Sequence, residues 1–81
     1  MNIGFESNSG HKKIIATPVD IKVKDLLLAF AEEVNIDKRN LGKNIFFLFN
    51  GSKININEEK NIKEYGLRDF SIITVLDFLI Y

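Results

Sequence analysis

The sequence predicts a small α+β domain, with one main helix on a mixed sheet of four to five strands and a further short helical turn. Three observations support this fold class. Apolar residues follow strand-like patterns in several segments, one stretch shows the spacing of an amphipathic helix, and single glycines separate the segments. The chain of 81 residues has room for one domain, residues 1–81, and without cysteine its apolar core must provide the stability.

The amino-terminal segment predicts a β-hairpin. Residues 2–6 alternate weakly between apolar and polar side chains, as in a strand with one buried face. Residues 8–10, Asn-Ser-Gly, are turn formers, and residues 12–17 contain two isoleucines and predict the second strand. Pro18 ends this strand because it has no N–H group to donate.

The chain from Lys22 to about Val34 predicts the main helix. Apolar residues recur there at intervals of three and four, which places them on one helical face. These residues are Val23, Leu26, Leu27, Phe30, Ala31 and Val34. Asp20 is a candidate N-cap, and Asp25 lies in the first turn, where the helix dipole favours a negative charge. We expect the helix to end near Asn35.

The centre of the chain predicts a loop and a second hairpin. Residues 37–44 are polar and contain a glycine, which indicates a connecting loop. Residues 45–49 are a dense aromatic strand, and Asn50-Gly51 after them is the dipeptide most typical of a tight hairpin turn. Ile54 and Ile56 alternate with polar residues and predict a short partner strand.

The last third of the chain predicts a helical turn and a final strand. Residues 57–61 form a charged loop, and residues 62–67 form a single helical turn closed by Gly66. Residues 71–81 are rich in Ile, Val, Thr and Phe and predict the last strand.

The charge balance excludes some classes of partner. Eleven basic and eleven acidic residues give a formal net charge of zero, so no basic excess exists to displace counterions from a nucleic acid. The apolar run of residues 45–49 is far shorter than the roughly 20 residues of a membrane span, and the amino terminus does not resemble a signal peptide. We expect a cytoplasmic or nuclear protein that binds neither nucleic acid nor a membrane.

The residues offer little for catalysis. His11 is the only imidazole, and its sequence neighbours on a hairpin turn cannot supply a nucleophile, a base and an oxyanion hole. The pairs Glu32-Glu33 and Glu58-Glu59 are interpreted as solvated carboxylates. Adjacent helical residues point about 100° apart, so the first pair cannot converge on one substrate. No metal-ligand spacing or phosphate-binding glycine loop occurs. We therefore expect no enzyme activity, no metal site and no cofactor.

In this order, the elements resemble ubiquitin and its relatives over most of the chain. The resemblance rests on the Gly10 turn, the helix stripe with Ile36 after it, Leu48-Phe49-Asn50-Gly51 with Ile54, Ile62-x-x-Tyr65-Gly66-Leu67, and Ile73 with Val75. It implies a β-grasp fold with about four extra residues in the 37–44 loop and about two in the 56–61 loop. Lys13 departs from the family, which usually turns an apolar residue inward there. A shifted register that uses Ile14 is the alternative.

The resemblance also implies a partner-binding surface. Partners of the family dock on an apolar patch of outward residues on the sheet. The central isoleucine of that patch corresponds to Leu48 here, and the patch valine of the last strand corresponds to Leu76. The patch histidine falls on Thr74 and the patch leucine of the first hairpin falls on Asn8. These two departures make the edge of the surface more polar than in ubiquitin.

Three further residues complete the predicted site. Phe46 and Phe47 alternate along their strand, so one of them, taken as Phe46, shares the outer face with Leu48. Gly51 lies in the turn that follows. Asp25 resembles an acidic residue that some splicing-associated ubiquitin-like proteins use to pair with an arginine of a partner helix.

The end of the sequence implies a non-covalent role. Covalent modifiers of this family end in Gly-Gly, whereas this sequence has no glycine after Gly66, and two linkage lysines of the family fall on Ser52 and Asp69. Residues 78–81, Phe-Leu-Ile-Tyr, are four consecutive large apolar residues. Three alternatives are open for these residues. They extend the last strand and pack, the chain continues beyond them in a larger protein, or they form the edge of a dimer.

The leading interpretation is a non-covalent ubiquitin-like interaction module with ubiquitin-receptor, proteasome or splicing-type partners. The first alternative is a ubiquitin-like modifier with an atypical or unprocessed carboxyl terminus. The second is an assembly domain that dimerises through its last strand, in which the outer apolar residues are covered by the terminal run or by another copy.

Overall fold

The computed structural model describes residues 1–77. Its elements follow the predicted order, with one additional short helix: β1 (Asn2–Ser7), β2 (Lys12–Ala16), α1 (Val23–Glu33), η1 (Lys38–Asn40, a 3-10 helix), β3 (Ile45–Phe49), β4 (Ser52–Lys53), α2 (Ile62–Tyr65) and β5 (Ile72–Asp77). The predicted continuation of the last strand through residues 78–81 lies outside the described residues.

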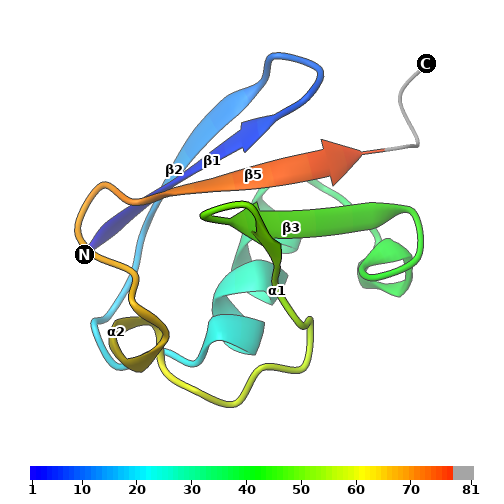
Figure 1. Ribbon diagram of the computed structural model, residues 1–81. Helices are drawn as coiled ribbons and strands as arrows, with labels where there is room; N and C mark the ends of the chain where they lie inside the picture. Colours follow the sequence, from blue (N-terminus) through cyan, green and yellow to red (C-terminus); the bar gives the residue numbers. More distant parts are fainter. Residues whose placement is uncertain (78–81) are drawn as a thin grey trace.

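The strands form one mixed sheet, as predicted. Its order is β2-β1-β5-β3-β4, so β1 and β5, from opposite ends of the chain, pair in parallel at its centre. The other neighbouring strands pair antiparallel, and α1 lies across one face of the sheet (Figure 1). This is the β-grasp arrangement that the sequence predicts.

The core lies between α1 and the sheet and contains the inward residues of both. Three aromatic rings are at its centre. The Phe5 and Phe30 rings stack with centroids 4.2 Å apart, and Phe47 meets both rings edge-on. Since Phe47 is fully buried and Phe46 is half-buried, Phe46 is the phenylalanine that faces away from α1, as predicted.

The start of α1 corrects one prediction. The N-cap position is Lys22, not Asp20, and no side chain caps the helix. The first N–H groups are instead bound by a distant loop: Val23 N donates to the Lys60 carbonyl at 2.9 Å, and Lys24 N donates to the Glu58 carbonyl at 3.1 Å. Because these carbonyls satisfy N–H groups that a helix leaves unpaired, a side-chain cap is unnecessary.

The register of the first hairpin is unshifted, so the alternative that turns Ile14 inward is wrong. Lys13 is paired with Phe5, and Ile14 is paired with Gly4 on the outer face, where Ile14 is 62% exposed. Because β2 is an edge strand, the Lys13 side chain reaches past the core and forms an ion pair with Glu33 at 3.1 Å.

The second hairpin is shorter than expected. Asn50 (φ 52°) and Gly51 (φ 79°) form the predicted tight turn, which places Ser52 opposite Phe49 and Lys53 opposite Leu48. The predicted partner strand over Ile54–Ile56 is therefore wrong, because pairing begins directly after the turn and ends at Lys53. Ile54 enters the core instead, with 2% of its surface exposed.

Local side-chain chemistry determines the two short helices. The predicted loop of residues 37–44 contains η1, whose N-cap Asp37 accepts a hydrogen bond from Arg39 N at 2.9 Å. Asn61 and Glu64 form a capping box at α2, and Gly66 ends this helix in the left-handed conformation at φ 101°. The helical turn closed by Gly66 is thus confirmed.

Candidate interaction surface

The structure brings four of the predicted site residues together on the sheet face opposite α1, which we call the outer face. Adjacent antiparallel strands pair Leu48 of β3 with Thr74 of β5, and Phe46 with Leu76. Leu48, Phe46 and Leu76 are half-buried and Thr74 is exposed, whereas their inward neighbours Phe47 and Val75 are buried. Two central strands therefore hold three large apolar side chains in fixed positions on this face.

A cation and a recess lie at the β4 side of this surface. Lys53 Nζ lies 4.3 Å from the centroid of the Phe46 ring, a cation–π contact. A hollow of about 370 Å³ adjoins the same ring, and Ile54 and Ile56 also line it. Phe46 thus has one ring face near a charge and borders a recess that can receive a side chain.

Asn8 and Gly51 lie at opposite margins of the outer face. The Asn8 side-chain oxygen accepts a hydrogen bond from Asp77 N at 3.1 Å, and Asn8 N donates to the Val75 carbonyl at 3.0 Å. These bonds fix Asn8 beside Leu76. Gly51 lies at the tip of the β3–β4 turn, where an added Cβ would meet no atom within 4 Å.

Asp25 is not part of this surface. It lies exposed in the first turn of α1, which covers the other face of the sheet (Figure 1). An Asp25 contact and an outer-face contact therefore require separate sites on a partner.

The outer face also contains apolar residues that the sequence-based site omitted. Ile14 is 62% exposed and Ile72 51%; Phe70, which lies in the turn before β5, is 65% exposed. Gly4 lies between Ile14 and Ile72 in the sheet register, and a Cβ on Gly4 would lie only 2.6 Å from Ile72 Cδ1. Alternation along β2 and β5 could have identified both isoleucines, since each lies an even number of residues from an outward position.

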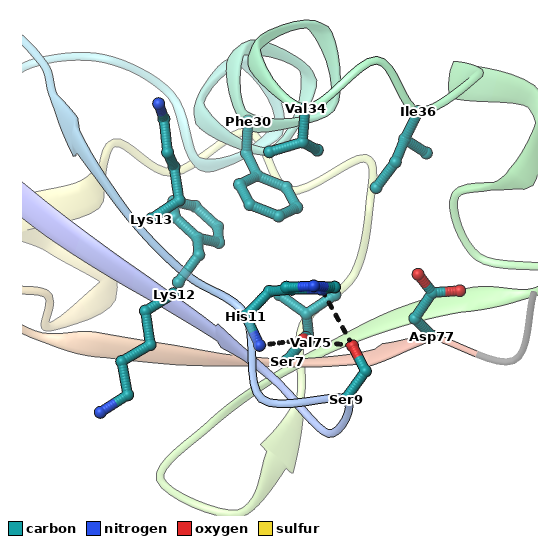
Figure 2. A pocket seen from close by; sticks show the side chains of 11 residues that line it. Ser7, Ser9, His11, Lys12, Lys13, Phe30, Val34, Ile36, Val75 and Asp77 are labelled. Atoms are coloured by element: carbon teal, nitrogen blue, oxygen red, sulfur yellow. Dashed lines mark hydrogen bonds between the residues drawn. The ribbon is translucent and has the colours of Figure 1, made fainter. Parts of the chain in front are cut away.

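A pocket of about 280 Å³ lies on the opposite side of the sheet, between α1 and the β1–β2 hairpin. Figure 2 shows Phe30, Val34 and Ile36 on the helix side and His11 and Asp77 on the strand side. It was not predicted, because its walls come from segments far apart in the sequence.

The hairpin turn at this pocket is held by hydroxyl groups. Ser7 Oγ and Ser9 Oγ lie 2.8 Å apart, Ser9 Oγ lies 3.2 Å from His11 Nδ1, and His11 N donates to Ser7 Oγ at 3.1 Å. All these contacts are solvent-exposed, and no carboxylate takes part in them. The arrangement is that of a turn, with no third group to orient the imidazole as a base.

One glutamate of each acidic pair forms an ion pair: Glu33 with Lys13, and Glu59 with Lys22 and Lys24. Lys24 and Lys22 both bind Glu59, with N–O distances of 2.5 and 2.9 Å, and these hydrogen bonds hold the pKa of Glu59 at about 2. Hydrogen bonds from Arg39 likewise lower the pKa of Asp37 to about 2. Both groups are at the surface; Glu59 joins its loop to the start of α1, whereas the Asp37–Arg39 contact lies within one short segment.

Two kinds of feature are absent from residues 1–77. No cluster of three or more His, Cys, Asp or Glu side chains in this range is suited to hold a metal ion. Within the same range, no helix combines the length and apolar character needed to cross a membrane.

The fold matches those of solved ubiquitin-like proteins. The ubiquitin-like (UBL) domain of Plasmodium falciparum Dsk2 is similar with a TM-score of 0.75 at 23% identity, over 95% of this chain and 96% of that one. A structure titled "Molecular Mimicry of SUMO promotes DNA repair" is similar with a TM-score of 0.72 at 24% identity, over 93% of this chain and 88% of the other. No curated protein matches by sequence. The sequence of residues 1–76 matches the family described as "Ubiquitin-2 like Rad60 SUMO-like", and the chain therefore belongs to this ubiquitin-like family.

Proposed function

We propose that this ubiquitin-like chain is a non-covalent protein-interaction module that binds partners through the outer face. The observation that carries the proposal is the pair of cross-strand contacts, Leu48 with Thr74 and Phe46 with Leu76, which present large apolar side chains from the two neighbouring strands β3 and β5. Residues on paired strands lose little freedom on binding, so such a surface is preorganised.

The charges around this face favour a partner with acidic flanks. The register places five outward residues in one row across the sheet: Lys12, Glu6, Thr74, Leu48 and Lys53. A lysine lies at each end of this row. A short amphipathic helix with an apolar stripe and carboxylates on either side would place apolar side chains on Leu48 and Leu76 and negative charges near the lysines.

The recess beside Phe46 supplies an anchor point. Hot-spot side chains of a partner commonly fill a hollow at the centre of an interface. The hollow of about 370 Å³ lined by Phe46, Ile54 and Ile56 adjoins the apolar residues of β3 and suits one such side chain. The two similar structures, a UBL domain and a protein described as a SUMO mimic, support protein partners for this fold.

The non-covalent part of the proposal rests on the sequence. The 81 residues contain no Gly-Gly dipeptide, the motif that conjugation would use. The mass of the protein isolated from its own cells tests this point: attachment to a lysine of another protein would favour the modifier alternative.

Nuclear magnetic resonance can test the binding surface. The ¹⁵N-labelled chain is titrated with a synthetic amphipathic helix that has a Leu/Ala stripe and glutamates at both ends. We expect amide shifts centred on Leu48, Thr74 and Leu76. Leu48→Ala should weaken binding about tenfold or more, which corresponds to about 1.4 kcal/mol.

Leu28 provides a matched control, because it is 38% exposed on α1, on the other side of the sheet. Leu28→Ala should leave the affinity unchanged. Shifts confined to α1, or a loss of binding with Leu28→Ala and not with Leu48→Ala, would show that the outer face is not the site. A concentration-dependent dimer in sedimentation that is lost when the chain is ended at Asp77 would favour the assembly alternative.

A further inference from the structure

A second apolar region lies on the outer face, next to the residues of the proposed site. Ile14 of β2 and Ile72 of β5 lie in one row with Gly4 of β1 between them, and they are 62% and 51% exposed. Gly4 has no side chain, and a Cβ there would lie only 2.6 Å from Ile72 Cδ1. The Ile72 side chain therefore leans over β1, the strand between it and Ile14. Together the two isoleucines present apolar surface over three neighbouring strands.

This region is continuous with the proposed site along β5. The outward residues of β5 are Ile72, Thr74 and Leu76, and the last two pair with Leu48 and Phe46 of β3. Alternate residues of a strand are about 6.6–6.8 Å apart, so the three outward positions extend over about 13 Å. Ile72 thus adds a third step to the surface that Thr74 and Leu76 form.

The spacing of these steps matches the spacing along one face of an α-helix. Residues i and i+4 of a helix belong to the same apolar stripe and are separated by a rise of about 6 Å. A helix that lies along β5 can therefore place one side chain near each of the three outward positions. It needs about nine residues to reach from Leu76 to Ile72, and a shorter helix leaves Ile72 and Ile14 uncovered.

The charges beside the stripe suit a helix with acidic flanks. Lys53 of β4 lies on one side of it, and Lys12, the outward residue of β2 next to Ile14, lies on the other. Neither lysine forms an ion pair with another residue of the range 1–77. Carboxylates on the two flanks of a bound helix would therefore meet cations that have no competing carboxylate partner.

We propose that the outer face binds one amphipathic helix of about three turns that lies along β5, with Ile72 and Ile14 contacting its end. This contact selects helices with three apolar steps over helices with two. The inference rests on the proposed function and extends its site by one row, to the row of Gly4.

Three synthetic helices of about 16 residues test this contact by nuclear magnetic resonance titration of the full-length chain. The first has leucine at three successive i, i+4 positions and glutamates on both flanks. The second and third replace the first or the last leucine with glutamine. Ile72→Thr should weaken binding of the three-leucine helix about fivefold or more. It should not affect binding of one of the two glutamine helices, because the leucine that contacts Ile72 is missing there.

The controls separate this inference from the proposed function. Val19→Thr should leave every affinity unchanged, because Val19 is 54% exposed in the segment between β2 and α1, outside the sheet. Ile14→Thr, on the edge strand, should repeat the selective loss. If Leu76→Thr weakens binding and Ile72→Thr does not, the third step is wrong and the proposed site stands. If neither variant weakens binding, the outer face is not the site and the inference fails with it. An equal loss for Ile72→Thr with all three helices would also overturn the contact.

Discussion

Removing the Phe30 ring by Phe30→Ala tests how the core is assembled. Phe30 is 5% exposed, its ring stacks on Phe5 with centroids 4.2 Å apart and planes 15° apart, and it meets Phe47 edge-on at 5.9 Å. It is the aromatic contact between α1 and two strands of the sheet. The substitution therefore removes the contacts by which the helix and the sheet share one core.

The expected loss is large relative to the total stability. A buried Phe→Ala substitution costs about 3–5 kcal/mol, and the stacked and edge-on neighbours place Phe30 in the upper part of that range. Small domains have roughly 0.05–0.15 kcal/mol of stability per residue, which is about 4–12 kcal/mol for a chain of this length. Phe30→Ala should thus remove a third or more of the free energy of unfolding.

Urea unfolding followed by circular dichroism measures this loss, with the m-value checked for a change in the denatured state. Phe70→Ala is the matched control: its ring is 65% exposed, and alanine retains the strain of the positive φ of 66°, so its cost should stay below about 1 kcal/mol. Similar losses in the two variants, or a loss below about 1.5 kcal/mol for Phe30→Ala, would refute the assignment of this ring as the central core contact.

Three other predictions concern turns, charge and the outer face. Gly66→Ala should cost about 1–2 kcal/mol through backbone strain at φ 101°, since the added Cβ would meet no atom within 4 Å. Gly66→Asn should recover part of this loss in thermal unfolding. The pKa of Glu59 is lowered from 4.5 to about 2, chiefly by its hydrogen bond from Lys24, so its stabilising contribution is present above pH 4.5 and is lost as the pH falls towards 2. Urea midpoints at several pH values should therefore show a smaller loss between pH 5 and pH 2 for Glu59→Gln than for the unsubstituted chain, and equal losses would contradict this. Gly4→Ala should cost less than about 1 kcal/mol, because the clash is with the movable Cδ1 of Ile72; a larger loss would mean that Ile72 is held in place.

The order of the elements could be predicted because local signals agree with the fold. The helical stripe of α1, the Asn50-Gly51 turn and the Gly66 stop each act over a few residues, and each is confirmed. One failure of local reasoning involves distant partners. Asp20 is not a cap because the carbonyls of Glu58 and Lys60 bind the N–H groups of α1, and no signal near the helix indicates them.

The placement of the predicted site residues could be predicted only in part, for the same reason. Alternation places Phe46 and Leu48 on one strand face, but their pairing with Leu76 and Thr74 depends on the register between β3 and β5. Asp25 resembles a binding residue in sequence and nevertheless lies on the other side of the sheet. Ile14 and Ile72 were omitted, although strand alternation could have identified them, because the predicted site was carried over from the family resemblance.

By itself, the sequence determined the class of fold, the main helix and the turns, because hydrophobic period and turn chemistry are properties of neighbouring residues. It also determined that no cysteine and no excess of charge are present. The tertiary structure alone decided which outward residues lie side by side and where the pocket opens. Both depend on the parallel pairing of β1 with β5, which joins residues about 68 positions apart and which no local pattern specifies.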